Sequence, residues 1–310
     1  MKESQATAQL DIWSDWLLHR RSGDDPSYER SVRAATERFC NHVLDGAKLG
    51  PGMTLADIGT GEGLIAFRAI DRIGPSLRVF LTDISKQILD HAKTMATQRN
   101  VQFQCTFLPC SAERLAGIQD STVDVVTMRS VLAYVFDKLA ALRECKRILK
   151  PGGRISIAEP IFLDDAFDTV NLKTQVDAKN GDPILPLLHR WKSAQFPDTL
   201  EKIAKSTIAR HSERDLVRLI HSLGFSDIHL ELHINITPSD IPSWDVFLDV
   251  APHPWAPTLR EVLNKFTPQE RLLFENTMRP TIESGQYSLS DRMAYITAAK
   301  PNCRMANSTI

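Results

Sequence analysis

The stretch Met53–Leu64, which decides the fold of this chain, reads MTLADIGTGEGL. A short apolar run with Asp57 near its end is followed by three glycines, and a periodic apolar segment then resumes. This pattern is typical of a strand, a tight turn and a helix. Glycine permits positive φ and lets a ligand approach the backbone, and the N–H groups of a helix start can face a polar or anionic ligand. We therefore expect a nucleotide-type cofactor at this turn.

Strand and helix patterns alternate downstream of the turn. Apolar runs predict further strands at 77–83, 101–110, 123–132 and 154–162, later ones at 226–236 and 292–300, and helical patterns separate most of them. Such alternation implies right-handed crossovers and a mostly parallel sheet. The expected fold is a Rossmann-like, doubly wound, seven-stranded α/β sheet with a helical N-terminal prefix and helical cap insertions.

The alternation lapses twice, which divides the chain into segments. We expect a helical prefix at 1–50, a cofactor-binding core at 51–163, a helical cap insertion at 164–210, a core continuation at 211–237, a second helical insertion at 238–290, a last core strand at 291–300 and a frayed tail at 301–310. In the prefix, Ile12, Trp13, Trp16 and Leu17 share one helix face, and we expect the tryptophans to be packing anchors rather than substrate contacts.

Composition excludes several classes of protein. The net charge of −1 disfavours a nucleic-acid partner. No apolar run approaches the roughly 20 residues of a membrane span, and the first residues lack a signal-peptide pattern. The five cysteines are scattered without a CxxC pair, which favours free thiols in a reducing, cytoplasmic setting.

The glycine spacing alone leaves the cofactor open. Gly59, Gly61 and Gly63 follow G-x-G-x-G, whereas the dinucleotide fingerprint is G-x-G-x-x-G. Asp83 ends the next predicted strand, where a carboxylate can bind both hydroxyls of a ribose. An NAD-binding dehydrogenase is thus one alternative at this point.

Five longer stretches narrow the choice. They read LADIGTGEG, LTDIS, CSAERL, VDVVTMRSVLAYV and RECKRILKPGGRISIAEP. As a set they resemble class I S-adenosylmethionine-dependent methyltransferases, and they are most similar to the small-molecule branch with the quinone and arsenite enzymes. The resemblance implies S-adenosylmethionine as cofactor and transfer of its methyl group to an O, N, S or C nucleophile of a small molecule under the helical cap.

The resemblance also implies roles for residues of this chain. Asp57 and the backbone of Gly59–Gly61 would hold the methionine part. Asp83 would take the ribose hydroxyls, with Ile84 against the adenine. The full set of implied cofactor residues is Asp57, Gly59, Thr60, Gly61, Gly63, Asp83, Ile84, Ser111, Ala112 and Arg129. Ser111 stands where this family often carries an aspartate that accepts from the adenine amino group.

Two side chains are candidates for catalysis. Tyr134 follows the fourth predicted strand, where a phenol could orient a nucleophile or take its proton, or could simply pack. His189, in the first insertion, could line the substrate pocket or lie on the surface of the cap. A sulfonium is already a strong electrophile, so proximity and orientation can suffice without a dedicated base.

A metal site is not expected. His229, Glu231 and His233 alternate and would share one strand face, with Ile228, Leu230, Leu232 and Ile234 toward the core. Three ligands on one flat face suit few ions, which favours a solvated polar face.

Two other functions remain as alternatives. The same fold could catalyse elimination, cyclisation or another displacement, because function depends on the site. The chain could also be a non-catalytic partner that retains the fold. The apolar N-terminal helices could cover the pocket or exchange between subunits of a homodimer. A small-molecule acceptor, without nucleic acid or membrane, is the expected partner.

Overall fold

Seven strands form one sheet in the order β3-β2-β1-β4-β5-β7-β6. The structure is a computed structural model that describes residues 10–178 and 181–302. Neighbouring strands pair in parallel from β3 to β5, and β7 pairs antiparallel with β5 and β6. The strands are β1 Thr54–Ile58, β2 Arg78–Asp83, β3 Cys105–Pro109, β4 Val123–Arg129, β5 Leu149–Pro160, β6 Ser226–Pro238 and β7 Ser288–Ala299. The predicted Rossmann-like, mostly parallel, seven-stranded sheet is confirmed.

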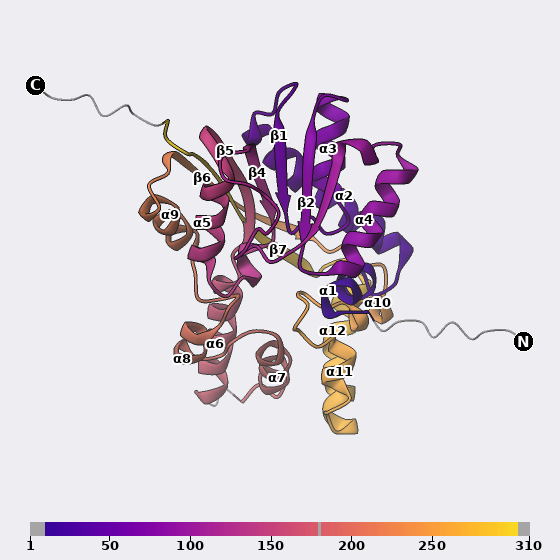
Figure 1. The fold of residues 1–310 in the computed structure, drawn as a ribbon. Helices are drawn as coiled ribbons and strands as arrows, with labels where there is room; N and C mark the ends of the chain where they lie inside the picture. The colour runs from indigo at the N-terminus through magenta and orange to yellow at the C-terminus, as the bar shows by residue number, and fades with distance from the viewer. Residues whose placement is uncertain (1–9, 179–180, 303–310) are drawn as a thin grey trace, which may run out of the picture.

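Helices cover both faces of the sheet (Figure 1). Side chains of successive strand residues point to opposite faces, so Leu55 packs on one face while Ala56 and Ile58 pack on the other. On the Leu55 face lie α2 Pro26–Ala47, α3 Leu64–Ile73 and α4 Lys86–Gln98, and on the opposite face lie α5 Lys138–Ile148 and α9 Glu213–Ser222. Both faces of β1 are thereby buried, which fixes the glycine turn at its end.

Several predicted element boundaries differ from the structure. The helix α5 ends at Ile148, and β5 begins at Leu149 rather than at 154, so the PGG sequence at 151–153 lies inside the strand. The register between β4 and β5 shifts here, which lets the strand accommodate the two glycines. β3 begins at Cys105 rather than at 101, after a short 3₁₀ turn at Gln102–Gln104.

The two insertions pack against each other as one helical layer. The first contains α6 Leu163–Asp177, α7 Leu185–Gln195 and α8 Leu200–Lys205, and the second contains α10 Trp244–Asp249, α11 Leu259–Leu263 and α12 Pro268–Glu283. Trp191 of α7 meets Phe247 of α10 and Phe274 of α12 edge to face, inside an apolar cluster that also includes Tyr28 of α2. Figure 1 shows both insertions beyond one end of the sheet, below it in this view.

A short N-terminal segment crosses the same end of the sheet. It consists of α1 Ile12–Asp15 and a π-helical turn, Trp16–Arg20. Its helical character is as predicted, but Ile12 is exposed whereas Trp13, Trp16 and Leu17 are half-buried. π-Helical turns are rare and frequently occur at functional sites.

The edge strand β6 departs from its predicted facing. Ile228 and Leu230 pack against the core, as expected, whereas Leu232 and Ile234 are exposed. The reason is that β6 is the outermost strand and continues past the cluster that covers its first half.

No helix within residues 10–178 and 181–302 is long and apolar enough to cross a membrane. The expectations for the first residues of the prefix, for Cys303 and for most of the tail lie outside the described residues.

Candidate active site

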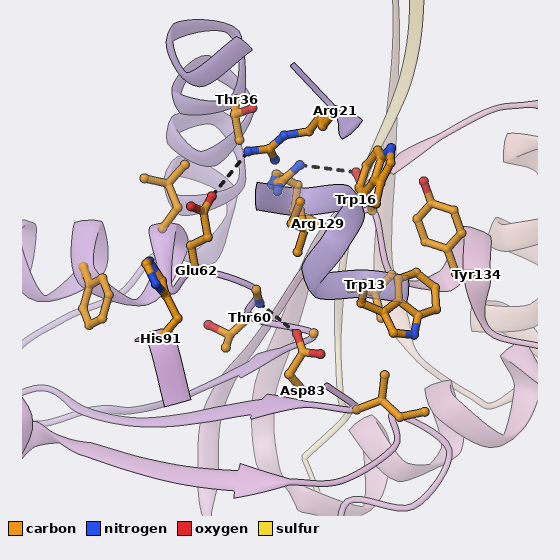
Figure 2. A pocket seen from close by; sticks show the side chains of 18 of the residues that line it. Trp13, Trp16, Arg21, Thr36, Thr60, Glu62, Asp83, His91, Arg129 and Tyr134 are labelled. Carbon is orange, nitrogen blue, oxygen red and sulfur yellow. Dashed lines mark hydrogen bonds and ion pairs between the residues drawn. The ribbon is translucent and has the colours of Figure 1, made fainter. Parts of the chain in front are cut away.

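A cavity of about 1020 Å³ lies at the carboxyl ends of β1, β2 and β4. This is the edge at which open α/β sheets bind their ligands. Figure 2 shows side chains from the N-terminal segment, from α2 and from the strand ends pointing toward it. Of the residues predicted from sequence, those that line the cavity are Gly59, Thr60, Gly61, Asp83, Ile84, Ser111, Ala112, Arg129 and Tyr134.

The glycine turn needs glycine for steric reasons. Gly59 has φ 61°, and a Cβ there would lie 2.5 Å from Cγ2 of Val131, in the loop after β4. Gly63 has φ 83°, and its Cβ would lie 2.5 Å from the ring of Phe67. Both approaches are closer than carbon atoms tolerate, so the turn can pack against its neighbours only without side chains. Gly63 therefore shapes the start of α3 and does not line the cavity.

Asp83 links the turn to the neighbouring strand. Its Oδ2 accepts a hydrogen bond of 2.9 Å from the amide of Gly61, and its Oδ1 accepts one of 2.9 Å from the amide of Ser85. The residue is only 8% exposed. Burial raises the pKa of this carboxyl, while the two amide hydrogen bonds oppose the shift. A buried acceptor is thus held at the cavity wall by the main chain.

Asp57 lies behind the wall rather than in it. Its carboxylate accepts hydrogen bonds from the hydroxyls of Thr60, at 2.6 Å, and Thr127, at 2.8 Å. The side chain is buried and is not among the residues that line the cavity. Asp57 therefore braces the turn against β4, which differs from the direct ligand contact that the resemblance implied.

Two guanidinium groups and one carboxylate meet at the side of the cavity formed by the N-terminal segment (Figure 2). Arg21 pairs with Glu62 at 3.3 Å, and Arg129 lies near enough to lower the pKa of Arg21, after burial itself. The Nε of Arg21 is buried and has no hydrogen-bond partner among the described residues. A ligand anion here would meet a buried cation with an unused donor.

Aromatic side chains form another part of the wall. Trp13 and Trp16, which we expected to be packing anchors, both line the cavity. They also pack: the ring of Trp13 lies 5.4 Å from Tyr134 and 5.8 Å from Trp255, in edge-to-face contacts. Trp255 comes from the second insertion, so the N-terminal segment and the insertion meet over this end of the sheet.

Two large apolar side chains also line the cavity, Ile84 after β2 and Phe136 in the loop before α5. Ile84 and Phe136 line the cavity yet are 64% and 68% exposed, an unusual state for large apolar side chains. In the loop after β3, Ser111 Oγ donates to Glu113 Oε2 at 3.2 Å. Glu113, which the sequence analysis missed, places a carboxylate at the end of β3, where Ser111 alone would leave none.

Glu159 supports this wall from behind, and sequence reasoning missed it as well. Its fully buried carboxylate accepts from the amides of Val131, at 3.1 Å, and Ala133, at 3.0 Å. These bonds hold the loop that carries Tyr134. The available signal was its position at the end of the IAEP strand, because ligands bind at the edge where the carboxyl ends of parallel strands meet.

The structure does not bring His189 to the cavity. It lies on α7, where its Nε2 is 3.1 Å from Oδ2 of Asp198, and it is absent from the lining residues. The cap histidine thus contacts Asp198 within the helical layer.

The groups that line the cavity fit an adenosyl amino acid. The apolar side chains of Ile84 and Phe136 suit a purine, and the Asp83 carboxylate suits the hydroxyls of a ribose. The Nε of Arg21, which has no partner among the described residues, suits the carboxylate of an amino acid. The fold and this site define a Rossmann-like protein that holds a nucleoside cofactor at the strand ends.

Comparison with known proteins identifies the family. The model of a family described as "Methyltransferase domain" matches residues 49–204, half of the chain, and the chain belongs to this family. The ubiquinone/menaquinone biosynthesis C-methyltransferase of Shewanella frigidimarina is 30% identical over 187 residues, 60% of this chain and 72% of that protein. The tRNA 5-carboxymethoxyuridine methyltransferase of Escherichia coli K12 is 32% identical over 112 residues, 36% of this chain and 42% of that protein.

Solved structures share the fold at lower identity. A putative methyltransferase from Bacillus halodurans aligns with a TM-score of 0.52 and 17% identity, covering 85% of this chain and 99% of that one. The [4+2]-cyclase SpnF aligns with a TM-score of 0.50 and 17% identity, covering 92% and 87%. Geranyl diphosphate C-methyltransferase from Streptomyces coelicolor, solved with S-adenosyl-L-homocysteine, aligns with a TM-score of 0.50 and 20% identity, covering 91% and 88%.

The chain is therefore an S-adenosylmethionine-dependent methyltransferase, as predicted from its motifs. This excludes the NAD-binding dehydrogenase as a reading of the glycine turn.

Proposed function

We propose that this enzyme transfers the methyl group of S-adenosylmethionine to an O, N, S or C nucleophile of a small, flat acceptor that binds against Trp13, Trp16 and Tyr134. The observation that carries the proposal is the aromatic wall itself, which meets the glycine turn and Arg129 in one cavity. Aromatic faces and edges hold flat ligands by offset and edge-to-face contacts.

The cofactor would lie along the strand ends. Ile84 and Phe136 would hold the adenine, Glu113 with Ser111 would face its amino edge, and Asp83 would bind the ribose hydroxyls. The backbone of Gly59–Gly61 would follow the methionine part. Arg21 would bind the methionine carboxylate, because a guanidinium buried beside Arg129 gains from a neighbouring anion. Arg129 would remain near the acceptor.

The chain's part in the reaction is orientation. The cofactor supplies a methyl group on a sulfonium, which is already electrophilic, so a positioned nucleophile can suffice. Burial and the nearby Glu159 raise the pKa of Tyr134, so we assign its phenol to packing and orientation, with its proton retained. His189 lies outside the cavity and has no role in this assignment.

A small acceptor is favoured over a nucleic acid. The N-terminal segment and the second insertion meet over the cavity, and the chain has a net charge of −1. Because the Shewanella relative is a C-methyltransferase of quinone biosynthesis, phenols and quinols are the first acceptors to test.

Product analysis with methyl-labelled cofactor tests the proposal. We expect label in a phenolic or quinol product. In a parallel reaction with tRNA as the acceptor, we expect no label in the tRNA. Conversion of an acceptor without label would instead support elimination or cyclisation. If, in addition, calorimetry shows no binding of S-adenosylhomocysteine, the result would support the alternative that the chain is a non-catalytic partner protein that retains the fold.

A second experiment tests the assignment of Arg21. Arg21→Gln should weaken binding of S-adenosylhomocysteine by about 10- to 100-fold, the range for a hydrogen bond to a charged group. Binding of 5′-methylthioadenosine, which lacks the amino-acid carboxylate, should stay within about threefold. Arg30→Gln, an exposed arginine of α2 outside the cavity, is the matched control. Equal losses for both ligands would contradict the assignment.

A further inference from the structure

A second group of polar side chains lies on the edge strand β6, outside the cofactor cavity. His42 of α2 and His233 of β6 both direct Nε2 at Oε2 of Glu231, each at 3.2 Å. The ligand atoms of these three residues all lie within 4.8 Å of one another. His229 precedes Glu231 by two residues, on the same face of β6, and its Nε2 lies 3.3 Å from Oε1 of Glu231.

Two of these separations match those within a coordination shell. Zn²⁺ binds His nitrogen and carboxylate oxygen at about 2.0–2.1 Å with tetrahedral geometry, so its ligand atoms lie about 3.3 Å apart. The two contacts of Glu231 Oε2, at 3.2 Å, have that length. Imidazole with carboxylate suits zinc and its transition-metal neighbours, whereas Ca²⁺ and Mg²⁺ prefer oxygen ligands alone.

His42 removes the geometric objection that the sequence raised. His229, Glu231 and His233 by themselves would offer ligands from a single flat strand face. α2 crosses this part of the sheet and brings the imidazole of His42 from another direction. Nothing in the sequence pairs position 42 with position 231.

Tyr295 of β7 holds the two imidazoles in place. It lies directly opposite Glu231 in the β6–β7 pairing. Its ring centroid is 4.0 Å from that of His42 and 4.8 Å from that of His233. Packing of this kind restricts the ring rotations that would otherwise cost entropy on metal binding.

The group is accessible and leaves room for a further ligand. The side chains of His42, Glu231 and His233 are 35%, 42% and 40% exposed. A recess of about 440 Å³ is lined by His42, His229 and Glu231 among others. Water can therefore complete four-coordination, or His229 after a rotation of its side chain.

We propose that His42, Glu231 and His233 form a binding site for a divalent transition-metal ion, with Zn²⁺ the best fit. The site joins α2 to β6. Asn41, next to His42, lines the cofactor cavity together with Thr36 and Glu37 of the same helix. A bound ion would thus fasten the helix that forms one wall of that cavity. The proposal depends on the fold alone and is independent of the acceptor.

Calorimetric titration of the full-length, chelator-treated protein with ZnCl₂ tests this. We expect one equivalent to bind, and His42→Gln and His233→Gln each to weaken binding at least tenfold. His221→Gln, an exposed histidine on α9, should leave the affinity unchanged. His229→Gln then reports the fourth ligand: a tenfold loss assigns it to His229, and no change assigns it to water.

Two further measurements separate this site from others. Glu231→Gln keeps the size of the side chain but removes its charge, so it should lose zinc affinity while keeping the melting temperature of the metal-free protein. The Co²⁺-loaded protein should show the visible absorption of nitrogen and oxygen ligation without thiolate charge transfer. Absence of zinc binding, unchanged binding in a His42→Gln/His233→Gln double variant, or a thiolate band would overturn the proposal.

Discussion

The backbone amide of Gly61 donates a hydrogen bond of 2.9 Å to Oδ2 of Asp83, which joins the glycine turn after β1 to the end of β2. The two residues are 22 positions apart in the chain, and both line the cavity. The bond occupies one side of the carboxylate and fixes its orientation. Lone pairs that remain on the two oxygens can then accept hydroxyl groups of a ribose.

Asp83→Asn should weaken S-adenosylhomocysteine and 5′-methylthioadenosine alike, because both contain the ribose. A hydrogen bond to a charged group contributes about 1.5–3 kcal/mol, so we expect about 10- to 100-fold in each dissociation constant by calorimetry. Asp90→Asn, on the exposed side of α4, is the control and should bind both ligands normally. A loss confined to one ligand would show that Asp83 does not contact the ribose.

Asp57 should make stability depend on pH. Burial raises its pKa from 3.8 to about 6, although the hydroxyls of Thr60 and Thr127 oppose the shift. Between these values the folded protein retains a proton that the unfolded chain has released. The raised pKa therefore favours the fold at low pH, and this contribution is lost as the pH rises through about 6.

Asp57→Asn removes this titration. Relative to wild type, the free energy of unfolding of the variant should rise between pH 4 and pH 7, by at most about 3 kcal/mol. Urea denaturation at several pH values measures the difference. A difference that is constant with pH would mean that Asp57 is ionised in the folded protein throughout this range.

The sequence predicted the part of the site that is built from local strand–turn–helix patterns. Gly59 and Gly61 follow β1 and Asp83 ends β2, two strands whose carboxyl ends meet at one sheet edge, so their proximity follows from the parallel topology. The position of the Asp57 carboxylate behind the cavity wall could not be predicted, because a pattern shows that a residue belongs to a turn but not which way its side chain points.

Long-range packing decided what the sequence could not predict. Arg21, Trp13 and Trp16 reach the cavity only because the N-terminal segment folds back over the strand ends. His189 lies outside the cavity, in contact with Asp198 within the helical layer. His42 joins Glu231 through the crossing of α2 over the sheet. None of these contacts has a local sequence signal.

The N-terminal segment should act as a cover that slows cofactor release. Asp11 attaches it to α4: its carboxylate accepts from Ser85 Oγ at 2.6 Å, and its amide donates to Gln87 Oε1 at 2.7 Å. The same carboxylate caps α1. Asp11→Ala should remove the cap, worth about 0.5–2 kcal/mol, and raise the dissociation rate of S-adenosylhomocysteine by roughly 3- to 30-fold if the cover opens first.

Stopped-flow displacement measures that rate. Asp24→Asn, just beyond the other end of the segment, removes the charge from the exposed pair with His19, is tolerated at the positive φ of this position, and should leave the rate unchanged. An unchanged rate in Asp11→Ala would mean that the cofactor leaves without movement of the segment.

Tyr134 provides the sharpest test of how the reaction is catalysed. Burial, and then the charge of Glu159, raise the pKa of its phenol, so the group should not release its proton near neutral pH. Tyr134→Phe keeps the ring contacts with Trp13 and Trp255 and should hold kcat within about threefold of wild type.

Tyr134→Ala removes those contacts and should raise KM for the acceptor by about tenfold. Tyr287→Phe, a half-buried tyrosine that packs against the helical layer, is the matched control. General acid–base catalysis contributes about 10²–10⁴-fold. A loss of that size in kcat for Tyr134→Phe, with KM unchanged, would therefore assign proton transfer to the hydroxyl and contradict a purely orienting role.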